Sequence, residues 1–137
     1  MEINGIAHTM VTVADFDRAR AFYGKLLPFL GMNEVMDFPG RYYCVGGRTG
    51  FGIQEAPEGS RADRFDQNRV GLHHLCFRAR TREDVDEAYE LVKTLGTPII
   101  HGPEEAVWAP GYYSILFEDP DGIRLEINHV PGKGLLS

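Results

Sequence analysis

Three residues of this chain have side chains that suit metal chemistry. His8 lies in the apolar stretch IAHTMVTV, His74 lies in the similar stretch LHHLCFRA, and Glu126 lies in a third such stretch, IRLEINHV. Neutral imidazoles and a carboxylate bind Fe, Mn, Ni, Co or Zn ions, and a set of two histidines and one carboxylate leaves coordination positions open. An ion held in this way can activate water or polarise a substrate oxygen. We therefore predict one divalent metal ion bound by His8, His74 and Glu126.

Alternation along the strands predicts which side chains face the same cavity. Successive residues of a strand point to opposite faces, and the apolar set is expected to face a covering helix. His73 is therefore expected on the face opposite to His74. The residues expected on the cavity side of the three strands are His8, Met10, Thr12, His74, Cys76, Arg78, Arg124, Glu126 and Asn128.

The positions of the two histidines reflect an internal repeat. A strand, a helix and three further strands occur twice, and the helices are expected over residues 15–27 and 81–96. A polar linker separates the two copies. We expect a single α+β domain over residues 1–137, built from modules at about residues 5–56 and 71–130.

The repeat also indicates a fourth residue. Gln54 comes four residues after Gly50, and Glu126 comes four residues after Gly122. We therefore expect Gln54 and Glu126 at equivalent places of the two closing strands. A neutral amide is a weak ligand, so Gln54 is either a fourth metal ligand or a contact for a bound water or substrate.

Two adjacent tyrosines lie on the strand expected beside Glu126, and alternation allows only one of them to face the cavity. We favour Tyr113 over Tyr112 as a catalytic residue together with Glu126, because a phenol near a bound oxygen can donate a hydrogen bond or a proton. The alternative is a packed aromatic ring whose hydroxyl lies at the rim.

Further cavity-side residues are candidates for substrate binding. Arg124 either pairs with an anionic substrate or forms an ion pair with a neighbouring acid, which we favour. Cys76 is expected to line the cavity as a small apolar residue rather than to act in redox chemistry or as a ligand. Met10 and Trp108 either form part of the cavity wall or belong to the core.

Composition narrows the class of partner. The formal net charge is −6 and the basic residues are scattered, which argues against nucleic-acid binding. No apolar run approaches the ~20 residues that span a bilayer, and the first residues do not resemble a secretory signal. The two cysteines do not form a disulfide framework, so we expect a cytoplasmic protein. Its expected partner is a small-molecule substrate.

The segments HTMVTVADFDRARAFYGKLL, GLHHLCFRA and GYYSILFEDPDGIRLEI resemble the vicinal oxygen chelate superfamily. This family includes glyoxalase I, extradiol dioxygenases, fosfomycin-resistance enzymes and bleomycin-resistance proteins, and the chain looks most like its small bacterial members. The resemblance implies two βαβββ modules in a pseudo-twofold arrangement, whose eight strands form a cup around the metal. It places the ligands at His8, His74 and Glu126, and an optional fourth ligand at Gln54. Bacterial glyoxalase I has a glutamate there, so this chain departs from that enzyme.

Three functions follow from these features. We favour a metal-dependent enzyme acting on a small oxygen-chelating substrate, with lyase, isomerase, transferase and dioxygenase chemistry all open. The first alternative is a small-molecule binding or drug-sequestering protein of the bleomycin-resistance type. The second is an interaction module with a vestigial pocket. Small proteins of this kind often dimerise, so a homodimer is expected.

Overall fold

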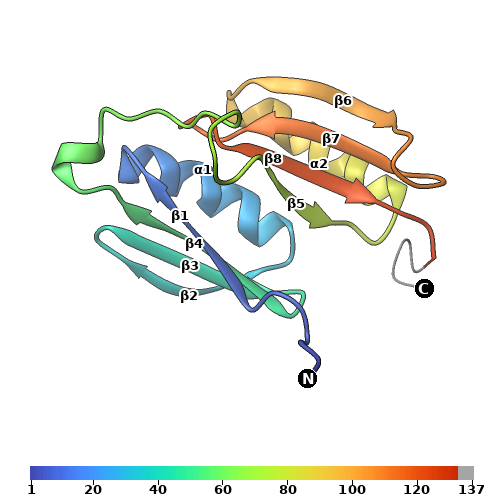
Figure 1. Ribbon diagram of the computed structural model, residues 1–137, viewed down its shortest axis with the longest axis horizontal. Coiled ribbons are helices and arrows are strands. Elements are labelled where there is room, and N and C mark those ends of the chain that lie inside the picture. The colour runs from blue at the N-terminus through green and yellow to red at the C-terminus, as the bar shows by residue number, and fades with distance from the viewer. Residues whose placement is uncertain (133–137) are drawn as a thin grey trace. The chain divides into compact units, whose positions relative to one another are not determined.

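The computed structural model describes residues 1–132 and divides into two compact units (Figure 1). The first unit is Met1–Asp63, and the second begins at Arg64. Each unit contains a strand, a helix and three further strands, so the predicted α+β class and the two βαβββ modules are confirmed.

The first unit is a four-stranded sheet with a helix against it (Figure 1). Its strands lie in the order β1-β4-β3-β2; β1 is parallel to β4 and the other pairs are antiparallel. The elements are β1 (His8–Val13), α1 (Phe16–Phe29), β2 (Asn33–Phe38), β3 (Arg41–Gly46) and β4 (Thr49–Glu55), followed by the short 3-10 helix η1 (Glu58–Ser60).

The second unit repeats this order as β5-β8-β7-β6, with β5 parallel to β8 (Figure 1). Its helix contacts β6, β7 and β8. The elements are β5 (Leu75–Arg78), α2 (Arg82–Leu95), β6 (Ile99–Glu105), β7 (Tyr113–Glu118) and β8 (Arg124–His129).

Both helices begin at capping residues. The Asp15 carboxylate accepts a hydrogen bond from the backbone N–H of Arg18 at the start of α1. At the start of α2, Thr81 and Asp84 each accept a hydrogen bond from the other's backbone N–H, which completes a capping box. The apolar stripes then pack against the sheets through the buried residues Ala19, Phe22, Tyr23, Leu26 and Leu27 of α1 and Val85, Ala88 and Val92 of α2.

Alternation holds along β1. Val11 and Val13 are buried, whereas His8, Met10 and Thr12 lie on the exposed side of the strand. The helix-covered face therefore takes the apolar residues, as the sequence pattern predicts.

A tight turn determines where β8 begins. The side chain of Asp119 is buried, and its Oδ1 accepts hydrogen bonds from the backbone N–H groups of Asp121 and Ile123 at 2.8 and 2.9 Å. Gly122 has a φ of 83°, a left-handed conformation that suits glycine. The turn thus directs the chain into β8 and sets the position of Glu126 along that strand.

Among residues 1–132, no helix is both long enough and apolar enough to cross a membrane.

Candidate metal centre

Glu126 is the centre of a small polar cluster in the second unit. It is 8% exposed, and its Oε2 lies 3.1 Å from Nε2 of His74. Its other oxygen, Oε1, accepts a hydrogen bond of 2.5 Å from the hydroxyl of Tyr112. Each carboxylate oxygen therefore has its own partner.

The spacing of His74 and Glu126 suits two ligands of one ion. A divalent metal binds imidazole nitrogen and carboxylate oxygen at about 2.0–2.2 Å, so two adjacent ligand atoms are separated by roughly 3.0–3.5 Å. The 3.1 Å between His74 Nε2 and Glu126 Oε2 falls in this range. The pair therefore fits part of a nitrogen and oxygen metal site.

His8 belongs to the first unit. It lies at the start of β1 on the exposed face, and its ring meets that of Tyr43 edge to face with 6.4 Å between centroids. No group of three or more His, Cys, Asp or Glu side chains that could hold a metal ion occurs within residues 1–132. Of the three predicted ligands, His74 and Glu126 therefore lie together in the second unit. The third, His8, lies in the first unit.

Strand register corrects the predicted equivalence of Gln54 and Glu126. In the second unit Glu126 lies opposite Cys76, which is two residues beyond His74. In the first unit the residue two beyond His8 is Met10, and it lies opposite Gly52. Gly52 is therefore the counterpart of Glu126, and Gln54 lies two residues farther along β4. The predicted equivalence, which placed each residue four positions after a glycine, is wrong because the two glycines are not equivalent. Gly50 lies within β4, whereas Gly122 lies in the turn before β8.

The counterpart position in the first unit has no room for an acid. A Cβ at Gly52 would lie 2.7 Å from Met10 Sδ and 2.7 Å from a ring carbon of Tyr43. Gln54 itself accepts a hydrogen bond of 3.3 Å from the Arg41 guanidinium. The first unit thus presents a glycine where the second presents a carboxylate.

The structure also corrects the choice between the two tyrosines. The Tyr113 hydroxyl donates a hydrogen bond of 2.7 Å to Asp86 of α2, and the Arg82 guanidinium lies over its ring. Tyr113 shares the alternation of Ile115 and Phe117, whose side chains are fully buried. Tyr113 therefore faces the helix, and Tyr112, just before β7, is the tyrosine beside Glu126.

The groups around Glu126 keep their protons. Burial, followed by the hydrogen bond to Glu126, raises the pKa of Tyr112 far above that of an ordinary phenol. Burial, followed by the nearby charge of Glu126, raises the pKa of Cys76 to about 12. At neutral pH the Tyr112 phenol is a hydrogen-bond donor and the Cys76 thiol is neutral.

The other candidates have varied surroundings. Arg124 donates a hydrogen bond of 2.9 Å to Glu118, and the two side chains are only 22% and 21% exposed. Arg124 thus forms the predicted ion pair with a neighbouring acid. Met10 is 37% exposed and Trp108 is 72% exposed, so neither is a core residue.

Sequence reasoning misplaced His73. Its Nδ1 lies 2.8 Å from Nδ1 of His74, and the two rings meet edge to face with 5.1 Å between centroids. Alternation does not apply to this pair because β5 begins only at Leu75. Gly71 precedes the pair with a φ of 144°, and this glycine is the signal in the sequence that could have indicated an irregular backbone there.

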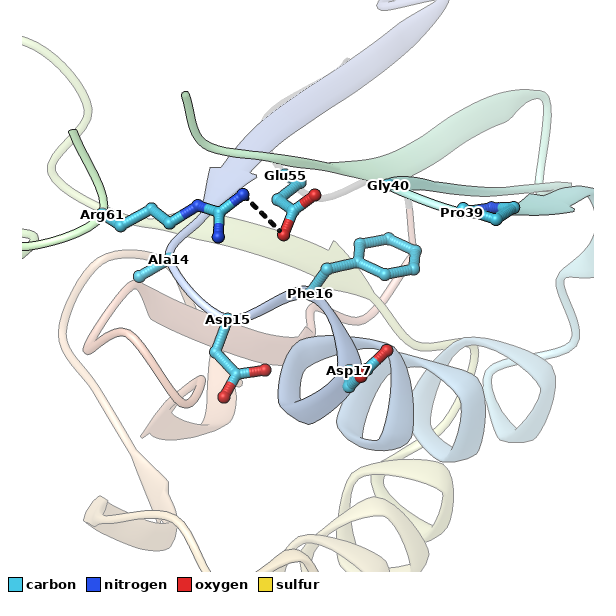
Figure 2. Close-up of a pocket in the computed structure, with 8 residues that line it drawn as sticks. All are labelled: Ala14, Asp15, Phe16, Asp17, Pro39, Gly40, Glu55 and Arg61. Atoms are coloured by element: carbon cyan, nitrogen blue, oxygen red, sulfur yellow. Dashed lines mark ion pairs between the residues drawn. The ribbon is translucent and has the colours of Figure 1, made fainter. Parts of the chain in front are cut away.

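A pocket of about 440 Å³ lies at the start of α1 (Figure 2). Arg61 reaches across it to Glu55, with 3.0 Å between nitrogen and oxygen (Figure 2). The lining residues are Ala14, Asp15, Phe16, Asp17, Pro39, Gly40, Glu55 and Arg61. None of the predicted site residues lines this pocket, so it is separate from the cluster around Glu126.

Comparison with known proteins assigns the family. The model of the Glyoxalase/Bleomycin resistance protein/Dioxygenase superfamily matches residues 5–127. The chain belongs to this superfamily.

Three similar proteins match this chain over most of its length. YqjT of Bacillus subtilis is 28% identical over 128 residues, which cover 88% of this chain and 94% of YqjT. The metallothiol transferase FosB of Shouchella clausii is 29% identical over 126 residues, covering 92% and 80%. The crystal structure of lactoylglutathione lyase from Agrobacterium tumefaciens matches with a TM-score of 0.68 and 27% identity, covering 94% of this chain and 96% of that one.

Proposed function

We propose that this superfamily member is a divalent-metal-dependent enzyme whose substrate is a small molecule with two neighbouring oxygen atoms. His74 and Glu126 would hold the ion, with His8 as the third ligand. The observation that carries the proposal is the separation of 3.1 Å between His74 Nε2 and Glu126 Oε2. The names of FosB and of the lactoylglutathione lyase favour transferase or lyase chemistry.

The number of ligands supports a substrate that binds through two atoms. Gly52 occupies the place in the first unit that corresponds to Glu126, so the proposed site has three protein ligands rather than four. Three protein ligands leave up to three positions of a six-coordinate ion for substrate and water. An ion bound there would polarise the substrate oxygens as a Lewis acid.

The protein's own groups have distinct tasks in this proposal. The Glu126 carboxylate offsets part of the positive charge of the ion, and the Tyr112 hydroxyl engages its Oε1 so that Oε2 is directed toward His74. The raised pKa of Tyr112 keeps the phenol protonated well above neutral pH, so it remains the hydrogen-bond donor to Glu126.

Metal analysis tests the proposal. Protein purified without a chelator is analysed for metal content and, after EDTA treatment and dialysis, titrated with Mn²⁺, Co²⁺ and Zn²⁺ by calorimetry. One ion per chain is expected, and His8→Ala and Glu126→Ala should each abolish uptake. Absence of metal and of uptake would reject the enzyme in favour of a binding protein, whose affinity for its ligand would survive EDTA.

We also propose a cytoplasmic homodimer. Cys44 and Cys76 are both free thiols, which suits a reducing compartment. Light scattering on the purified protein measures the mass in solution, and a mass of one chain would contradict the dimer.

A further inference from the structure

The two adjacent histidines before β5 form a direct contact that the metal-binding role of His74 does not explain. Nδ1 of His73 and Nδ1 of His74 are 2.8 Å apart. Two lone pairs do not attract each other at this distance, so one of these nitrogens carries the hydrogen. The contact therefore restricts which tautomer each ring adopts.

The contact of His74 Nε2 determines which of the two Nδ1 nitrogens donates the hydrogen bond. His74 Nε2 lies 3.1 Å from Glu126 Oε2, and an ionised carboxylate only accepts hydrogen bonds. A neutral His74 has one N–H, which must lie on Nε2 to meet Glu126. Its Nδ1 is then an acceptor, and Nδ1 of His73 is the donor.

A metal ion on His74 would reverse this assignment. With Nε2 as the ligand atom, the hydrogen of a neutral His74 would lie on Nδ1 and be donated to Nδ1 of His73. His73 then carries its own hydrogen on Nε2. The pair holds two N–H hydrogens before and after, so the change is an exchange of tautomers without net release of a proton.

We propose that His73 is a positioning residue, which holds the ring of His74 through the Nδ1–Nδ1 hydrogen bond and adopts the tautomer complementary to that of His74. The part of this inference that concerns metal affinity rests on the proposed function. The part that concerns the tautomers of the metal-free protein does not. Groups that hydrogen-bond a metal-binding histidine in this way typically change metal affinity by about 10- to 100-fold when they are removed.

Nitrogen NMR on the ¹⁵N-histidine-labelled wild-type chain tests the tautomers directly. At pH 8, the metal-free protein should show His73 as the Nδ1–H form and His74 as the Nε2–H form. Saturating Zn²⁺, which is diamagnetic, should convert His73 to the Nε2–H form and His74 to the Nδ1–H form. Finding His73 as the Nε2–H form in the metal-free protein would overturn the proposal.

Two substitutions test the affinity. His73→Leu removes the hydrogen bond and should weaken Zn²⁺ binding about 10- to 100-fold in calorimetry. His73→Asn is the matched control because its amide oxygen or nitrogen occupies the place of Nδ1, and it should bind Zn²⁺ within about threefold of the wild type. Both variants should fold, since His73 is exposed and precedes the strand, and circular dichroism checks this.

The outcomes separate this proposal from the proposed function. Equal Zn²⁺ affinity in the wild type and in His73→Leu would overturn the role of His73 and leave the metal site standing. A wild-type chain that takes up no metal would reject the proposed function. The tautomer of His73 in the metal-free protein then decides the present inference alone.

Discussion

At the scale of single residues, the two oxygens of Glu126 are distinguished by their partners. Oε1 accepts from the Tyr112 hydroxyl at 2.5 Å, whereas Oε2 lies 3.1 Å from His74 Nε2. Hydrogen bonds to a charged acceptor are stronger than those between neutral groups. The carboxylate is therefore held in one orientation, with a single oxygen available beside the imidazole.

The two tyrosines should respond differently to loss of their hydroxyls. Tyr112→Phe removes the donor to Glu126 and should weaken metal binding about 10- to 100-fold, as expected for a group that supports a ligand. Tyr113→Phe should leave metal affinity unchanged and lower the free energy of unfolding by about 1 kcal/mol, because it removes the hydrogen bond to Asp86. Calorimetric titration and urea unfolding of both variants measure these effects. The reverse pattern would restore Tyr113 to the site.

Loss of the Glu126 carboxylate and loss of the Gln54 amide should also differ in their effect on metal affinity. Glu126→Ala removes the proposed carboxylate ligand and should reduce metal affinity at least about 100-fold. Gln54→Ala should change it less than about threefold, because a neutral amide is a weak ligand. Gln54 lies opposite Thr12 and accepts from Arg41, two residues beyond the counterpart of Glu126. Titration of both variants with Co²⁺ makes the comparison, and equal losses would contradict the register argument.

At the scale of elements, the guanidinium of Arg20 joins helix α1 to β2 at the edge of its sheet. Arg20 donates to Asp37 Oδ1 at 2.9 Å and to Oδ2 at 2.7 Å, and it lies over the ring of Tyr42 with 3.8 Å from Cζ to the centroid. Gly24 lies one helical turn after Arg20, and a Cβ there would collide with the guanidinium. The glycine therefore leaves room for the Arg20 side chain. This cluster joins α1, β2 and β3.

The Arg20–Asp37 pair predicts a pH-dependent contribution to stability. The hydrogen bond from Arg20 lowers the pKa of Asp37 below its ordinary 3.8. A carboxyl whose pKa is lower in the folded than in the unfolded state stabilises the fold above its unfolded pKa, and this contribution is lost as pH falls through the folded value. Asp37→Asn should therefore be less stable than the wild type at pH 7, and the difference should shrink below pH ~3.8.

Urea unfolding at pH 7, 4 and 3 measures that difference. Glu87→Gln, on the exposed surface of α2, is the control for loss of one negative charge. A gap between Asp37→Asn and the wild type that stays constant from pH 7 to 3 would show that the ion pair does not contribute.

At the scale of the whole molecule, binding of the proposed metal ion should raise the stability of the folded protein. A ligand that binds only the folded protein stabilises it by about 2.7 kcal/mol at 100 times its Kd. For a chain of this size, such a gain raises Tm by roughly 5–15 °C. The wild type should show this rise with saturating Zn²⁺ and lose it with EDTA.

His8→Ala provides the decisive variant for this effect. His8 lies in the first unit and Glu126 in the second, so removing His8 should abolish the rise in Tm only if residues of both units bind the same ion. Differential scanning calorimetry measures the shift. An undiminished rise in His8→Ala would show that the ion binds to the second unit alone.

The sequence by itself determined the elements and their faces. Residues 15–27 and 81–96 closely match α1 and α2, and the stripe of Ala19, Phe22 and Tyr23 is buried as its spacing indicates. Val11 and Val13 are buried on β1 for the same reason. These features depend on the periodicity of a helix or strand, which neighbouring residues encode.

Tertiary structure alone decided how strands pair and where they begin. The pairing of β1 with β4 places Gly52 rather than Gln54 opposite Met10, and the start of β5 at Leu75 lets the rings of His73 and His74 meet. Packing of β7 against α2 turns Tyr113 toward Asp86. Each of these outcomes depends on hydrogen bonds and packing between segments far apart in the chain, so local periodicity does not encode it.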